Sequence, residues 1–243
     1  MKRIGLMALL FMLACVSVQA QKKTVKKAPA KKSAKGKKSS SKKKTSSGDP
    51  ILDELICYEG GPCTFNIYKG DTLVYNVNAT DKSYQFLVIP NKFDVSTGAD
   101  FNWVMTAPVN RKGRVTISAA ALKSGKRLIN YFNGGDLKLT DASTVWLSTD
   151  NFKDITNMNK PETKIAMDAG EPETFSSPEA DAVTPTINYK GREITLDGFA
   201  IESKPGGNAS RKELWVLNIT NNLLILKMDL GWTIELKEIR EKK

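Results

Sequence analysis

The chain has 243 residues, a formal net charge of +11 and no histidine. Its length provides for one sizeable domain or two small ones, and the missing imidazole excludes Ser-His-Asp and Cys-His catalysis and histidine-ligated zinc. Residues 1–48 hold 14 of the 37 Lys and Arg residues and none of the 26 Asp and Glu residues, so residues 49–243 have a net charge of −3. A domain that binds phosphates on its own surface usually shows the reverse balance.

The first twenty residues, MKRIGLMALLFMLACVSVQA, have the organisation of a secretory signal peptide. Lys2 and Arg3 give a positive start, residues 4–16 are apolar but too short to span a bilayer, and residues 18–20 (VQA) form a small-x-small cleavage site. We therefore expect cleavage after Ala20 and a periplasmic or secreted protein. A lipoprotein signal at Cys15 stays open, although Leu13 is bulky where such signals usually have a small residue.

Cleavage after Ala20 leaves two cysteines, Cys57 and Cys63. An even pair in an exported chain predicts a disulfide, and Gly60-Gly61-Pro62 between two apolar runs predicts a hairpin that brings the two thiols together. Closing so short a loop stabilises by roughly 2 kcal/mol in the chain-entropy model. The alternative is a redox pair, which usually has two intervening residues at a helix N-terminus, whereas five residues in a β context separate these cysteines.

A Lys-rich tail, residues 21–49, follows the signal peptide and is predicted to be disordered, since it cannot bury enough apolar area to offset its conformational entropy. Its stretch KKAPAKKSAKGKK resembles the tails of linker histones in composition. In an exported protein, however, the tail would meet anionic envelope material by weak, salt-screened contacts, including peripheral contact with a membrane, and no specific nucleic acid. The candidate polyanion-binding residues are Lys22, Lys23, Lys26, Lys27, Lys31, Lys32, Lys35, Lys37, Lys38, Lys42, Lys43 and Lys44.

From residue 50 onward, short runs of alternating apolar and polar residues predict β-strands. They are DTLVYNVNA, YQFLVIP, FNWVMT, GRVTISA and STVWLST, in chain order. Residues 215–219, 223–228 and 232–236 predict three antiparallel strands near the C-terminus, with turns at Asn221-Asn222 and Leu230-Gly231. The segments YKGDTLVY (68–75) and YKGREITL (189–196) repeat a Lys-Gly turn, which indicates either two similar hairpins or a duplicated β unit.

Two helices are expected to interrupt the strands. The first is predicted over residues 119–132, with Ser118 as its N-cap and Gly134-Gly135 as its end. A shorter one is expected over residues 150–158. We expect residues 165–186, which are acidic and rich in proline, to form an irregular connection between a β-rich domain over 50–164 and a C-terminal β unit over 187–243, although these two could also form one domain.

No cofactor motif and no catalytic constellation is evident: the chain has neither GxGxxG nor a Walker-type loop, and no acidic spacing typical of a calcium or other metal site. Two close carboxylate pairs, Glu171 with Glu173 and Asp94 with Asp100, lie in polar loops typical of solvated side chains. Among the four tryptophans, Trp215 and Trp232 lie on strands separated by one hairpin. Tryptophans on strands usually belong to the core, but these two are the candidates for the wall of a ligand pocket.

The C-terminal segment ELWVLNITNNLLILKMDLGWTIELKEI resembles the closing strands of secreted bacterial proteins with a lipoprotein-carrier-like half-open β-barrel, and YKGDTLVYNV is similar to the opening strand of envelope β-proteins. The resemblance implies an antiparallel curved sheet or half-barrel whose concave face could hold a hydrophobic ligand. We therefore expect a mainly β fold with one or two short helices. The expected function is non-enzymatic binding of a hydrophobic small molecule or an envelope partner. The alternatives are polyanion binding through the tail and a wall or glycan hydrolase with two carboxylates.

Overall fold

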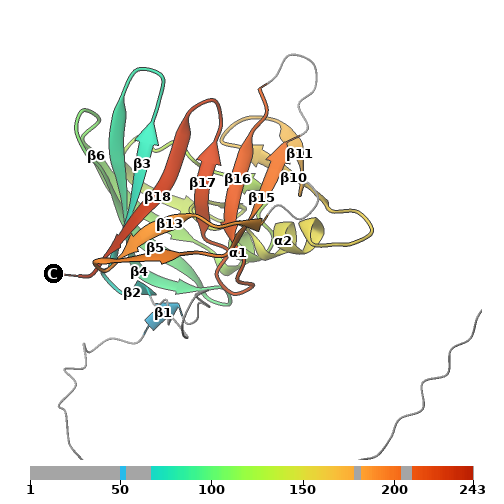
Figure 1. Cartoon of the computed structure of the whole chain (residues 1–243), viewed down its shortest axis with the longest axis horizontal. Coiled ribbons are helices and arrows are strands. Elements are labelled where there is room, and N and C mark those ends of the chain that lie inside the picture. Colours follow the sequence, from blue (N-terminus) through green and yellow to red (C-terminus); the bar gives the residue numbers. More distant parts are fainter. Residues whose placement is uncertain (1–49, 53–66, 178–181, 204–209, 243) are drawn as a thin grey trace, which may run out of the picture. The chain divides into compact units, whose positions relative to one another are not determined.

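A long, mostly antiparallel sheet that curls into a nearly closed barrel forms the core of the fold, as Figure 1 shows. The computed structural model describes residues 50–52, 67–177, 182–203 and 210–242, all of which belong to the unit Ser46–Lys243. The predicted mainly β fold class is confirmed. The signal peptide, the Lys-rich tail and the cysteine pair Cys57 and Cys63 lie outside the described residues, so these expectations stay predictions.

The described chain begins with two short paired strands, β1 (Pro50–Leu52) and β2 (Ile67–Tyr68). The first half of the barrel consists of β3 (Thr72–Asn78), β4 (Ser83–Asp94), β5 (Gly98–Met105), β6 (Arg111–Ile117), α1 (Ala119–Ser124), β7 (Arg127–Leu128), β8 (Gly135–Leu139), β9 (Ala142–Ser143) and α2 (Thr149–Ile155). The second half consists of β10 (Glu162–Met167), β11 (Pro172–Ser176), β12 (Ala182–Val183), β13 (Thr186–Tyr189), β14 (Arg192–Thr195), β15 (Gly198–Ser203), β16 (Glu213–Leu217), β17 (Ile225–Asp229) and β18 (Thr233–Arg240).

Two antiparallel meanders make up most of the barrel wall. Strands β3 to β6 pair in sequence, and so do β15 to β18, which confirms the three antiparallel strands predicted near the C-terminus. The meanders join where β18 pairs with β3 over Thr233↔Asn78 to Arg240↔Thr72. One sheet therefore contains strands from both predicted β units, 50–164 and 187–243.

The core consists of side chains that point inward at every second position of these strands. Cross-strand partners form layers inside the barrel: Ile234, Val77 and Tyr84 form one layer. The next contains Leu236, Tyr75, Phe86 and Met105. A third layer contains Leu73, Val88 and Trp103. This period-two burial explains why alternating runs located the long strands correctly.

The first helix is much shorter than the predicted 119–132. Ser118 caps α1 as expected, because its hydroxyl accepts a hydrogen bond from the Ala121 backbone N at 3.1 Å. The helix then ends at Gly125, whose carbonyl accepts a bond from the Asn151 side-chain nitrogen at 3.1 Å. Beyond it the chain is extended, and β7 lies between β9 and β10 in parallel pairing. The apolar residues after Gly125 fill the barrel from an extended segment, so their helical spacing was misleading.

The second helix is confirmed as α2, with Ser148 as its N-cap. The expected irregular connection over 165–186 is wrong for its described part: β10 and β11 form an antiparallel hairpin there. Ile165 and Phe175 are 1% and 0% exposed and supply its inward face. Glu171, Pro172 and Glu173, where the chain enters β11, obscured this alternation in the sequence, since Glu173 lies on the same face of the hairpin as Ile165 and Phe175.

The glycines of the two Lys-Gly turns have the same backbone conformation: Gly70 and Gly191 have φ angles of 90° and 82°, which favour glycine. Only the second turn closes a hairpin, β13–β14, whereas the first leads from β2 into β3. The two turns are nevertheless joined by an ion pair: Lys190 Nζ lies 2.7 Å from Asp71 Oδ2.

Asp71 is the more deeply buried residue of this ion pair. Its side chain is 1% exposed, and it accepts backbone hydrogen bonds from Tyr68 N at 2.9 Å and Lys242 N at 3.2 Å. Lys190 Nζ also lies 4.4 Å from the ring centroid of Tyr68. One buried carboxylate therefore connects β2, the β13–β14 turn and the segment after β18.

Replacing this carboxylate should destabilise the fold. We expect Asp71→Ala to lower the free energy of unfolding by about 3 kcal/mol, because the change leaves a largely buried ammonium and two backbone donors without their acceptor. Urea unfolding followed by far-UV circular dichroism measures the loss. The exposed Asp136 gives the matched control, since Asp136→Ala should change stability by less than about 0.5 kcal/mol. Equal stability of both variants would contradict the role assigned to Asp71.

Candidate ligand-binding site

One end of the barrel is closed by a segment that crosses its interior, residues 144–148. Trp146 forms a bridge with Leu224, and its indole nitrogen donates to Asn222 Oδ1 at 3.2 Å. The indole ring stacks on Phe93 with centroids 4.6 Å apart and meets the Phe101 ring edge-on at 5.8 Å. The predicted strand over STVWLST therefore pairs only in part and serves as a plug.

The plug segment is held in an unusual backbone conformation. Val145 has a φ of 64°, which is rare for a β-branched residue and interrupts the strand. Its carbonyl accepts a hydrogen bond from Ile225 N at 2.8 Å, and Leu147 N donates to Leu223 O at 2.9 Å. These bonds to the chain at and just before β17 fix the plug, and they place Val145 against a cavity in the barrel interior.

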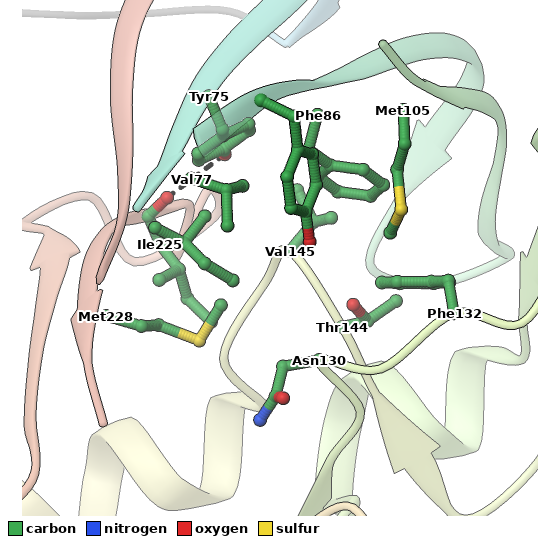
Figure 2. Close-up of a pocket in the computed structure, with 12 residues that line it drawn as sticks. Tyr75, Val77, Phe86, Met105, Asn130, Phe132, Thr144, Val145, Ile225 and Met228 are labelled. Carbon is green, nitrogen blue, oxygen red and sulfur yellow. Dashed lines mark hydrogen bonds between the residues drawn. The ribbon is translucent and has the colours of Figure 1, made fainter. Parts of the chain in front are cut away.

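That inner cavity is small and apolar, as Figure 2 shows. Its volume is about 20 Å³, enough for about one water molecule. The lining side chains come from both meanders, the plug and the segment after β7: Tyr75, Val77, Tyr84, Phe86, Met105, Asn130, Phe132, Thr144, Val145, Ile225, Met228 and Ile234. The Tyr75 hydroxyl donates to Ile225 O at 3.0 Å, and burial raises the pKa of this phenol.

A larger hollow, the mouth, adjoins the cavity at the open end of the barrel. The turns between β3 and β4, β5 and β6, and β17 and β18 all lie at this end. The mouth has a volume of about 410 Å³ and is lined by Lys82, Tyr84, Met105, Pro108, Val109, Arg111, Asn130, Tyr131, Phe132 and Trp232. Four of these residues, Tyr84, Met105, Asn130 and Phe132, also line the inner cavity.

The wall between the two hollows depends on Asp168, which sequence reasoning missed. Its carboxylate Oδ1 accepts hydrogen bonds from the backbone N atoms of Asn130 and Tyr131 at 2.8 and 3.0 Å. Phe132 then stacks on Phe86 with ring centroids 5.1 Å apart. Asp168 has a φ of 48° at the end of β10, and an isolated aspartate after a strand gave no signal of this positioning role.

The electrostatics of the mouth are set by a cation beside aromatic rings. Burial raises the pKa of the Tyr84 phenol, and the nearby Arg111 guanidinium opposes that rise. Arg111 is exposed, and among the described residues it donates only long hydrogen bonds, to Phe132 O at 3.5 Å and Asn133 Oδ1 at 3.4 Å. The mouth thus combines an apolar aromatic wall with positive charge.

The two tryptophans proposed as a pocket wall lie in different environments. Trp232 lines the mouth and packs against the core. Trp215 is half-buried between the fully buried Leu214 and Val216, so its side chain faces away from the barrel interior. Lys227 Nζ lies 4.3 Å from the Trp215 ring centroid. The structure therefore brings Trp232 to the candidate site and leaves Trp215 on the outer face.

The carboxylates considered for hydrolysis are absent from the lining of both hollows. Arg114 donates to Asp100 and holds the pKa of that carboxyl below its usual value. Hydrogen bonds from Ser96 lower the pKa of Asp94 in the same direction. A general acid needs the opposite shift, so neither Asp94 nor Asp100 is suited to that task.

The second carboxylate pair, Glu171 and Glu173, does not form a catalytic pair either. Glu173 on β11 forms an ion pair with Lys212, while Glu171 is exposed just before that strand.

In the described ranges, no group of three or more Cys, Asp or Glu residues is arranged to hold a metal ion. The helices of these ranges are too short or too polar to cross a membrane.

Comparisons with known proteins found no match to the chain among family models, curated proteins or solved structures. The resemblance to half-open barrels of secreted bacterial proteins therefore stays a prediction.

The Asp100–Arg114 pair makes stability depend on pH. Because the folded-state pKa of Asp100 is lowered, its contribution is present above the unfolded-state value of about 3.9 and is lost as the pH falls through the folded-state pKa. We expect Asp100→Asn to cost about 1 kcal/mol or less at pH 7, since Arg114 is 54% exposed and screened, and to cost progressively less as the pH falls below about 4. Urea unfolding at pH 7 and at a series of lower pH values tests this, with Glu171→Gln as an exposed control. A difference between Asp100→Asn and wild type that does not shrink as the pH falls would contradict it.

Proposed function

We propose that this protein is an exported, non-enzymatic envelope protein that binds a small hydrophobic ligand at the open end of its barrel. The observation that carries the proposal is the pairing of an apolar inner cavity with an aromatic mouth that shares four of its lining residues. Export is supported by the organisation of residues 1–20 as a signal peptide.

The size and chemistry of the two hollows favour a small ligand. The mouth, at about 410 Å³, falls in the range of roughly 300–1,000 Å³ that is typical of ligand pockets. Its wall is mainly aromatic and aliphatic, and such surface gains about 25 cal/mol for each Å² removed from water. The inner cavity, at about 20 Å³, takes only the tip of a ligand unless side chains move. Met105 and Met228 line it, and methionine adapts its shape easily.

The two tryptophans provide a matched test with N-phenyl-1-naphthylamine, a neutral fluorescent apolar probe. We expect Trp232→Ala to weaken probe binding about tenfold, which corresponds to ~1.4 kcal/mol, because an aromatic wall of the mouth is lost. Trp215→Ala should leave the affinity within about twofold of wild type, since Trp215 faces away from the mouth. Fluorescence titration gives both affinities, and circular dichroism checks that each variant is folded. Equal effects of the two changes, or no binding by wild type, would refute the proposed function.

The Lys-rich tail offers a second, separable activity, because 12 of its residues are lysines within 22–44 and no acidic residue lies among them. We expect deletion of residues 22–47 to abolish retention on heparin at low salt while leaving binding of the apolar probe unchanged. A tail with the same composition in a scrambled sequence should restore retention, since the expected attraction is electrostatic and does not depend on residue order. Retention that survives the deletion would show that the folded part binds the polyanion.

A further inference from the structure

Asn130, which lines both the inner cavity and the mouth, carries a buried side-chain donor. The Asn130 side chain is 7% exposed, and its Nδ2 atom finds no hydrogen-bond acceptor among the described residues. Its backbone N, in contrast, is bound by Asp168 Oδ1 at 2.8 Å, so the residue is held in place. A buried donor without an acceptor costs about 1–3 kcal/mol. A ligand oxygen bound to this donor would recover that cost.

Arg111 places a positive charge in the lining of the mouth. No carboxylate in the described part of the chain lies within ion-pair distance of its guanidinium, whereas Arg114, three residues along β6, pairs with Asp100. The two contacts of Arg111, to Phe132 O and Asn133 Oδ1, are 3.5 and 3.4 Å long. A guanidinium has five N–H donors, so Arg111 retains donors for an anion.

The lining of the mouth is unbalanced in charge. Lys82 and Arg111 contribute to it, and no Asp or Glu residue does. Lys82 is engaged with Asp81 at 3.6 Å, which leaves Arg111 as the stronger candidate for anion binding. The neighbouring wall is aromatic, with Phe132 and Trp232. The mouth therefore offers a positive charge for an anionic group and an aromatic surface for an apolar group.

We propose that the ligand is a small anionic amphiphile whose head group binds Arg111 and Asn130 and whose short apolar tail lies against Phe132 and Met105. The inference rests on the proposed function, since it specifies the ligand of the same site. A carboxylate or phosphate head group fits, because both accept paired hydrogen bonds from a guanidinium. The tail is short because the inner cavity beyond Phe132 and Met105 has a volume of only about 20 Å³.

Octanoate and octanol test the head group, because they share a tail length and differ in charge at pH 7. Both are titrated as competitors of N-phenyl-1-naphthylamine bound to the full chain. We expect octanoate to displace the probe at about tenfold lower concentration than octanol, and added salt to weaken octanoate alone. Arg111→Gln should abolish this preference by weakening octanoate about tenfold, and Asn130→Leu should weaken it several-fold. Arg111→Gln should affect displacement by octanol less than displacement by octanoate, since octanol carries no charge.

Lys112 supplies the matched control, since it is exposed, has the same charge and follows Arg111 directly on β6. Lys112→Gln should leave both competitors unchanged, and an equal loss in this variant would show that only general electrostatic attraction is at work. Octanol that competes as well as octanoate, or a bound probe that neither compound displaces, would refute the anionic head group while leaving the proposed function standing. Failure of the wild-type chain to bind the probe would refute both.

Discussion

The pairing of β18 with β3 is the constraint on which the rest of the structure depends. It joins the two meanders into one wall, and without it the inward layers that start at Val77 and Tyr75 would lose their neighbours Ile234 and Leu236. The buried Asp71 reinforces this joint at one end, because it is bound by Lys190 and by the backbone after β18. The pairing spans about two thirds of the chain, so loop-closure entropy opposes it and the burial of both meanders must compensate for that cost.

The pairing of β18 with β3 and the plug together determine at which end the barrel interior is accessible. Trp146 and its ring partners fill the end at which β3 begins and β18 ends, so the interior is accessible from the other end, where three turns surround the mouth. The segment after β7 completes that wall, because Asp168 holds Asn130 and Tyr131 by their backbone N atoms. The site is thus assembled from residues far apart in the sequence and positioned by the barrel.

Local pattern predicted the fold class well and the site poorly. Alternation in DTLVYNVNA and the C-terminal runs identified β3, β16, β17 and β18, because one buried face imposes a period of two. It failed after Gly125, where an extended segment between parallel strands happens to space its apolar residues like a helix. Trp232 was identified as a pocket residue, but Arg111 and Asn130 were not. Nothing in the neighbouring sequence indicates that Arg111 would have no ion pair, and Asn130 Nδ2 no acceptor, within the described part of the chain, since both conditions arise from tertiary packing.

The two methionines at the inner cavity bear on how selective such a site would be. Unbranched thioether side chains rearrange at little cost. The inner cavity would therefore discriminate only weakly between ligand tails of different shape. The mouth is more rigid at Arg111 and Asn130, because β6 fixes the first residue and Asp168 holds the backbone of the second. Discrimination among ligands would then be concentrated at the head group, and natural sequence changes at Met105 or Met228 would broaden or narrow the set of accepted tails without changing the chemical class that is recognised.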